Sequence, residues 1–150
     1  MSRNPVFPYA TARTIGRDCL CLRIQRASRI VGRRFDVALR PVGLNNWQFT
    51  LLVMLNRPSP LTVNGLAEEL AMDRTTTTKN LKPLERRGLL EIRQDEKDAR
   101  VRRIVLTASG HDVLTEALQY WQSTNDAIVA SLDGGTLACL RSGLDTIASS

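Results

Sequence analysis

Residues 61–110 constrain the fold of this chain more than any other segment, because helix, turn and strand signals follow one another there without interruption. Thr62 is placed as the N-cap of a short helix, about 63–71, whose apolar residues recur at helical spacing. Asp73 stands at the start of a second helix, about 74–87. Two capped helices joined by so short a turn are typical of a helix-turn-helix.

The residues after this helix pair predict a two-stranded hairpin. Gly88 ends the second helix at the position where a left-handed residue is usual. The runs 89–93 and 101–106 have the length and composition of short β-strands, and a charged segment, 94–100, separates them. A hairpin that follows a helix-turn-helix is a wing, so we predict a winged helix-turn-helix.

Longer helices flank this unit on both sides. Apolar residues recur at steps of three and four over about 15–40, where Pro41 stops the helix, and a second helix is predicted over about 45–56. Beyond the wing, a helix capped by Thr107 is predicted to run to about 132. A last helix is marked by four apolar residues, Leu137, Leu140, Leu144 and Ile147. These helices carry more apolar surface than one small core needs, which favours a dimerisation lobe; packing within one chain is the alternative.

The predicted fold class is therefore mainly α with a small β-wing, a winged helix-turn-helix whose N- and C-terminal helices form a dimerisation lobe. We expect residues 1–150 to be a single domain. Within it, 15–44 and 107–150 are the expected dimerisation helices, and 45–106 is the expected DNA-binding lobe. A DNA-binding lobe presents one helix to the major groove and a basic loop to the backbone or minor groove.

Composition agrees with a protein that faces phosphate. The net charge is +6, with nine Arg against two acids in residues 1–56 and one Arg against five acids in 104–150. No apolar run approaches the length that spans a bilayer, and no secretion signal is recognisable, so a cytoplasmic location is expected. Three Cys and one His lack metal-ligand spacing, so we expect no metal, no cofactor and no disulfide framework.

Four consecutive threonines open the second helix of the pair and mark it as the groove helix. Threonine stabilises helices poorly, but its hydroxyl bonds phosphates or base edges and its methyl contacts thymine. Thr77 shares a face with Leu81 and Leu84 and is expected to point inward. The candidate DNA contacts are Arg74, Thr75, Thr76, Thr78, Lys79, Lys82 and Arg86. Solvent exposure without contact is the alternative for the threonine run.

The hairpin tip supplies two further candidates, Asp98 and Arg100. Because they are two residues apart, they would share one side of a strand, and the carboxylate could hold the guanidinium in a fixed direction. An arginine presented in this way suits a narrow minor groove. A solvated charged turn is the alternative.

The segments Leu-Glu-Arg-Arg-Gly-Leu-Leu (84–90), Asp-Ala-Arg (98–100) and Leu-Thr-Ala-Ser-Gly (106–110) resemble the signature of MarR-family transcriptional regulators. The resemblance implies a homodimer on pseudo-palindromic double-stranded DNA, usually a repressor, with the terminal helices forming the dimer. It also implies that Arg100 enters the minor groove with Asp98 as its orienting partner.

Members of this family respond to phenolic or other small ligands, or to cysteine oxidation. The resemblance aligns Cys21 with the reactive cysteine of the branch that senses organic hydroperoxides, but the two tyrosines of that branch correspond here to Phe35 and Phe49. A disulfide from Cys19 or Cys21 to Cys139 of a second subunit is a further option, and structural thiols are the alternative.

Two other classes of function remain open at this stage. A thiol-based redox enzyme needs a base beside its reactive cysteine, and the lone His111 lies far along the chain, so no catalytic residue is expected. A winged-helix protein-interaction module would not need cations such as Lys79 and Lys82 on the groove face. We therefore expect a DNA-binding regulator.

Overall fold

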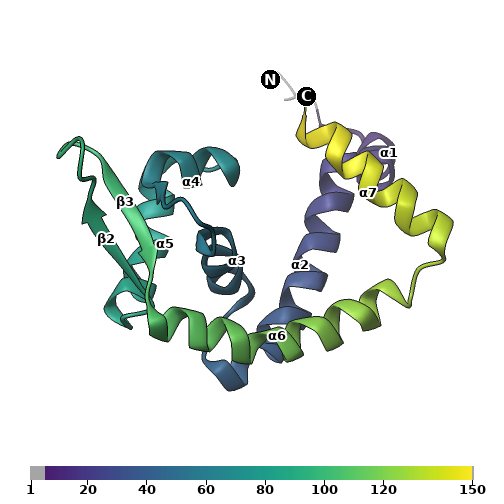
Figure 1. The fold of residues 1–150 in the computed structure, drawn as a ribbon. Coiled ribbons are helices and arrows are strands. Elements are labelled where there is room, and N and C mark those ends of the chain that lie inside the picture. Colours follow the sequence, from purple (N-terminus) through teal and green to yellow (C-terminus); the bar gives the residue numbers. More distant parts are fainter. Residues whose placement is uncertain (1–5, 150) are drawn as a thin grey trace. The chain divides into compact units, whose positions relative to one another are not determined.

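The computed structural model describes residues 6–149, so both ends of the expected domain 1–150 lie outside the described residues. Residues 1–34 and 35–150 form two compact units, and each is described by itself. Figure 1 shows the elements along the chain. In chain order they are α1 (Tyr9–Asp18), α2 (Leu20–Ala38), η1 (Arg40–Val42), α3 (Asn46–Leu55), β1 (Leu61–Thr62), α4 (Val63–Glu69), α5 (Arg74–Arg86), β2 (Leu90–Gln94), β3 (Arg102–Leu106), α6 (Ala108–Val129) and α7 (Gly134–Ala148). Among them, no helix is both long and apolar enough to cross a bilayer.

The prediction of one helix from residue 15 to 40 is wrong at its start. The helix begins earlier, at Tyr9, and is broken at Cys19, whose backbone is extended (φ −66°, ψ 110°). The break is stabilised locally, because the Arg23 guanidinium donates to the Arg17 carbonyl oxygen at 3.0 Å. Apolar periodicity continues across the break, so the sequence pattern did not reveal it.

The winged helix-turn-helix is confirmed, together with a strand that the sequence did not predict. The three strands form an antiparallel sheet in the order β1-β3-β2, with Leu61 opposite Ile104 and Leu90 opposite Leu106. The missed strand, β1, has only two residues, and its Thr62 is also the N-cap of α4, where its hydroxyl accepts from the Gly65 amide at 2.9 Å. The signal for the cap concealed the signal for the strand.

A compact leucine core joins α3, α4, α5 and the sheet. Leu52, Leu66, Leu81 and Leu84 are fully buried, and so is Thr77, as its face of the helix predicts. Leu70, at the end of α4, is only half-buried. Because the inward face of α5 is fixed by these contacts, its opposite face is directed outward.

The helices α3 and α6 also begin with a cap, and of these two caps the sequence predicted only the one at Thr107. Asn45 and Gln48 form a capping box at the start of α3, and the Thr107 hydroxyl accepts from the Gly110 amide at the start of α6. α6 ends at Val129, a little before the predicted 132. α7 begins at Gly134, directly after its N-cap Asp133, whose carboxylate accepts from the Thr136 amide at 2.8 Å.

The first turn of α6 is fastened to the base of the wing. The Thr107 hydroxyl donates to the Gly88 carbonyl oxygen at 2.6 Å, and the Thr107 amide donates to the Leu89 carbonyl oxygen at 3.2 Å. Gly110 lies directly against this junction: a Cβ there would overlap the Leu89 carbonyl oxygen and lie 2.8 Å from Cδ1 of Leu106. Only glycine fits at this approach of helix to sheet.

We expect Gly110→Ala to lower the free energy of unfolding by at least about 2 kcal/mol, because the added methyl group forces α6 away from Leu89 and Leu106. Urea unfolding followed by circular dichroism measures the change. Ser109→Ala, one residue earlier on the exposed side, is the matched control and should change stability by less than about 0.5 kcal/mol. Equal effects of the two substitutions would contradict the close contact.

Candidate nucleic-acid interface

The start of α5 is held by Asp73. Its carboxylate accepts from the Thr76 amide at 2.8 Å and from the Thr76 hydroxyl at 2.6 Å, which lowers the pKa of Asp73 below the ordinary value of 3.8. The Thr77 hydroxyl donates to the Asp73 backbone carbonyl oxygen at 2.9 Å. The cap therefore fixes the first turn of the helix that carries the candidate DNA contacts.

Most of the predicted groove residues lie on the exposed side of α5. Arg74, Thr75, Thr76, Lys79, Lys82 and Arg86 are exposed, whereas Thr78 is half-buried. The threonine hydroxyls are not all available as donors, because Thr76 bonds Asp73 and Thr78 donates to the Arg74 carbonyl oxygen at 2.8 Å. These oxygens retain lone pairs that accept hydrogen bonds.

The wing tip is organised differently from the sequence prediction. Asp98 and Arg100 lie in the turn before β3, not on a strand, and the Asp98 carboxylate accepts from the Arg100 backbone amide at 2.9 Å. At the tip of the wing, the ion pair joins Arg103 to Asp95 and does not involve Asp98 or Arg100. The predicted contact of the Asp98 carboxylate with the Arg100 guanidinium is thus replaced by a contact with the Arg100 backbone.

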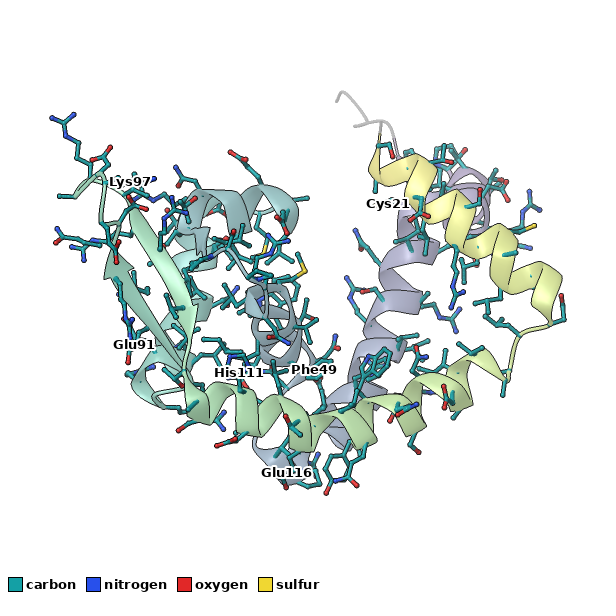
Figure 2. All side chains as sticks on the ribbon, in the orientation of Figure 1. Cys21, Phe49, Glu91, Lys97, His111 and Glu116 are labelled. Atoms are coloured by element: carbon teal, nitrogen blue, oxygen red, sulfur yellow. The ribbon has the colours of Figure 1, made fainter. Side chains whose placement is uncertain are left out.

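Asp95 is strongly acidic. The Arg103 guanidinium, followed by the backbone amides of Lys97 and Asp98, lowers the pKa of Asp95 to about 2. Figure 2 shows Lys97 at the far end of the hairpin, where its side chain is exposed. The sequence marked this segment as charged but did not indicate which charges pair.

One cavity of about 300 Å³ brings the wing and the groove helix together. Arg100 and Arg102 line it from the wing, Arg74 from the start of α5, and Thr62 and Asn64 from the start of α4. Three guanidinium groups around one open cavity can hold a phosphate group. Arg74 and Arg100 were predicted as DNA contacts from the sequence, whereas Arg102 was not, because nothing in the spacing places residue 102 beside residue 74.

A second, apolar groove runs between α3 and α6. Phe49, Val53 and Leu118 line two adjoining cavities of about 330 and 230 Å³. Trp121 lines the larger cavity and His111 lines the smaller one; Figure 2 labels Phe49 on α3 and His111 on α6. The His111 side chain is exposed and borders this groove.

The three cysteines are free thiols. Cys19 is half-buried at the break between α1 and α2, whereas Cys21 on α2 and Cys139 on α7 are exposed. The Gln25 side-chain amide donates to the Cys21 sulfur at 3.2 Å. Structural thiols that pack within one chain would be buried. Cys21 and Cys139 are exposed instead. Within residues 6–149, no group of three or more His, Cys, Asp or Glu side chains could hold a metal ion.

Comparison with known proteins agrees with this geometry. Residues 42–101 match the model of the MarR family. The chain is 34% identical to the Mycobacterium tuberculosis transcriptional regulator MosR in its crystal structure with DNA, with a TM-score of 0.76 over 88% of this chain and 97% of that one. The chain belongs to the MarR family.

Two curated relatives extend the comparison. The organic hydroperoxide resistance transcriptional regulator of Bacillus subtilis is 31% identical over 91 residues, which are 61% of this chain and 62% of the relative. The transcriptional repressor MprA of Escherichia coli K12 is 31% identical over 119 residues, which are 78% of this chain and 64% of the relative. The chain thus spans somewhat less than two thirds of either curated relative. Relatives and fold are those of MarR-family transcriptional regulators and not of enzymes, as the sequence predicts.

We expect Asp73→Ala to lower the urea midpoint of unfolding at pH 7, because α5 loses its cap. The folded-state pKa of Asp73 is depressed, so its stabilisation is complete above the ordinary pKa of 3.8 and is lost as the pH falls through the folded-state value. The difference from the unmodified protein should therefore shrink on acidification, in urea titrations between pH 7 and pH 3. Asp73→Ser keeps a capping oxygen and serves as the control; a difference that is independent of pH would contradict this assignment.

Proposed function

We propose that this chain is a sequence-specific DNA-binding transcriptional repressor that acts as a homodimer in the cytoplasm. α5 enters the major groove of a pseudo-palindromic operator, and the wing reaches the neighbouring minor groove with Arg100. The observation that carries this proposal is the cavity in which Arg74 of α5 meets Arg100 and Arg102 of the wing. The name of the related repressor MprA supports repression over activation.

The charged side chains of α5 and of the wing are proposed to contact different parts of the DNA. Lys79, Lys82 and Arg86 are exposed along α5 and are the proposed contacts to the phosphates and base edges of the major groove. Thr75, Thr76 and Thr78 are the proposed short-range contacts near the helix start, where backbone amides also favour a phosphate. The arginine-lined cavity is the proposed seat of a backbone phosphate between the two grooves. The role of Asp98 is to hold the backbone of Arg100 through their hydrogen bond.

Exposed apolar side chains on α1 and α7 support the proposed homodimer. Neither α1 nor α7 has a buried residue in the single chain, although both carry apolar side chains. On α7, Leu140, Leu144 and Ile147 recur at steps of four and three, and each is between 44% and 48% exposed. A second copy would cover this stripe as helices do in helix-on-helix packing. We accordingly retain 15–44 and 107–150 as the proposed dimerisation helices and 45–106 as the DNA-binding lobe.

We expect Arg100→Ala to weaken operator binding at least about tenfold while leaving the unfolding midpoint unchanged, because Arg100 is exposed and packs on no core residue. Fluorescence anisotropy with a duplex operator, selected from random DNA, measures the affinity. The unmodified protein should lose roughly 10³–10⁵ in affinity between 50 and 200 mM salt, as expected for 6–10 phosphate contacts by a dimer.

Arg57→Ala is the matched control for this experiment, since Arg57 is exposed in the loop before β1, pairs with Glu69, and is neither a proposed DNA contact nor part of the proposed dimerisation helices. It should leave operator affinity within about twofold. Binding that does not depend on salt would identify a protein-interaction module instead. Unchanged affinity of Arg100→Ala would remove the wing from the mechanism.

The proposed control of DNA binding has two candidate mechanisms. The groove between α3 and α6 is apolar, has the dimensions of a site for a small aromatic effector, and lies in the unit that carries the winged helix. Oxidation of cysteine is supported by the exposure of Cys21 and by the similarity to the hydroperoxide resistance regulator. Phe35 and Phe49 offer no hydroxyl to a thiolate, so the tyrosine-assisted route is absent and an intersubunit disulfide from Cys19 or Cys21 to Cys139 is the proposed oxidised form.

We expect an organic hydroperoxide or diamide to weaken operator binding and Cys139→Ser to abolish that response, because both proposed disulfides need Cys139 and a serine cannot form one; loss of the response in Cys21→Ser identifies Cys21 as its partner. Anisotropy before and after oxidation, with non-reducing electrophoresis to detect linked subunits, measures both effects. Gln25→Ala removes the hydrogen bond to the Cys21 sulfur and should alter only the rate of oxidation. Identical affinities of the oxidised and reduced protein would exclude the thiol mechanism and leave the effector groove.

A further inference from the structure

The carboxylate of Asp95 makes several of the hydrogen bonds that hold the wing together. Its side chain is only 12% exposed, although the residue opens a charged surface hairpin. One carboxylate oxygen accepts from the backbone amides of Lys97 and Asp98, at 2.9 and 3.1 Å, and the other pairs with the Arg103 guanidinium. The side chain of Asp95 therefore binds both limbs of the hairpin at once.

Arg103 connects Asp95 to a distant part of the chain. Its Nε pairs with Asp95, and its Nη1 donates to the Pro60 carbonyl oxygen at 2.9 Å, just before β1. Pro60 also precedes Thr62, the cap of α4. The guanidinium thus ties the wing to the strand that enters the helix-turn-helix.

A chain of hydrogen bonds leads from Asp95 to the tip arginine. The Asp95 amide donates to the Val101 carbonyl oxygen, and the Val101 amide donates to the Asp98 carbonyl oxygen, both at 2.9 Å. The Asp98 carboxylate then accepts from the Arg100 amide at 2.9 Å. The backbone that carries Arg100 is consequently fixed in relation to Asp95 and, through Arg103, to β1.

Arg103 and Arg100 face different sides of the wing. Arg100 and Arg102 line the cavity that also contains Arg74. Arg103 and Asp95 line a separate cavity of about 450 Å³ together with Arg93. Successive residues of a strand point to opposite faces, which explains why the neighbours 102 and 103 are separated.

We propose that Arg103 is a positioning residue: through Asp95 and Pro60 it holds the wing in the orientation in which Arg100 meets DNA. This inference rests on the proposed DNA-binding function. A wing that is ordered before binding does not lose conformational freedom on the operator, so affinity and specificity are both higher than for a loose hairpin. Because Arg103 works from the face opposite to Arg100, its effect passes through the backbone and not through a contact with DNA.

Asp95→Asn gives the sharpest test, because a long-range electrostatic effect and a positioning effect predict opposite changes in operator affinity. Removal of a negative charge near DNA should strengthen binding if only long-range charge matters. Loss of the ion pair with Arg103 should instead weaken operator binding, by about tenfold. Glu96→Gln is the matched control: it removes the same charge from the next, exposed residue, and it should leave affinity unchanged or slightly higher.

Arg103→Gln tests the other end of the same contact, with Arg93→Gln as its control. Arg93 lies directly opposite Arg103 on β2 and lines the same cavity, but it pairs with Glu91. We expect Arg103→Gln to lower operator affinity about tenfold and Arg93→Gln to lower it less than about threefold. When Arg100 is already replaced by alanine, adding Arg103→Gln should lower operator affinity by less than a further factor of about two. A residue that acts by positioning Arg100 has no effect once the Arg100 side chain is gone.

The slope of affinity against salt concentration adds an independent readout. A direct phosphate contact by Arg103 would lower that slope by about one when the residue is replaced, whereas a positioning role leaves the slope unchanged. Additive losses in the double variant, a reduced slope, or tighter binding by Asp95→Asn would each overturn the inference. If Arg100→Ala alone has no effect on affinity, the proposed function of the wing fails first, and the two failures are thereby distinguished.

Discussion

The burial of one face of α5 is the constraint on which the rest of the candidate interface depends. Leu81 and Leu84 are fully inaccessible to solvent, and Thr77 is buried with them. Rotation of the helix about its axis would expose these side chains, at a cost of about 1.5–3 kcal/mol for each leucine. The apolar face therefore determines where the polar face points. The positions of Lys79 and Lys82 are a consequence of leucine packing, and no separate interaction is needed to direct them outward.

The sequence predicted best where structure is decided locally. The caps formed by Thr62, Asp73 and Thr107 were identified because the capping residue and the amide it accepts from are three positions apart. The inward position of Thr77 followed from helical periodicity for the same reason. Such features require no knowledge of distant parts of the chain.

The features that the sequence did not reveal depend on long-range contacts or on weak local signals. The pairing of Arg103 with Pro60 spans 43 residues, and the arginine cavity depends on the register of β3 beside α4 and α5. The break at Cys19 has no proline and no capping signature, and it is supported by a side chain from the next helix, Arg23. The tip of the wing contains several acids and bases at similar spacing, so a pattern alone could not select Asp95 over Asp98 as the partner of an arginine.

The junction at Gly110 has a mechanical consequence. Since α6 has 22 residues and is attached at its first turn to the base of the wing, it is a rod about 33 Å long that ends on the hairpin. Leu118 and Trp121, which border the apolar groove, lie near its middle. A tilt of about 5° around the far end of such a rod displaces its attached end by about 3 Å. A molecule bound between α3 and α6 that tilts α6 would thus displace the hairpin without contacting it.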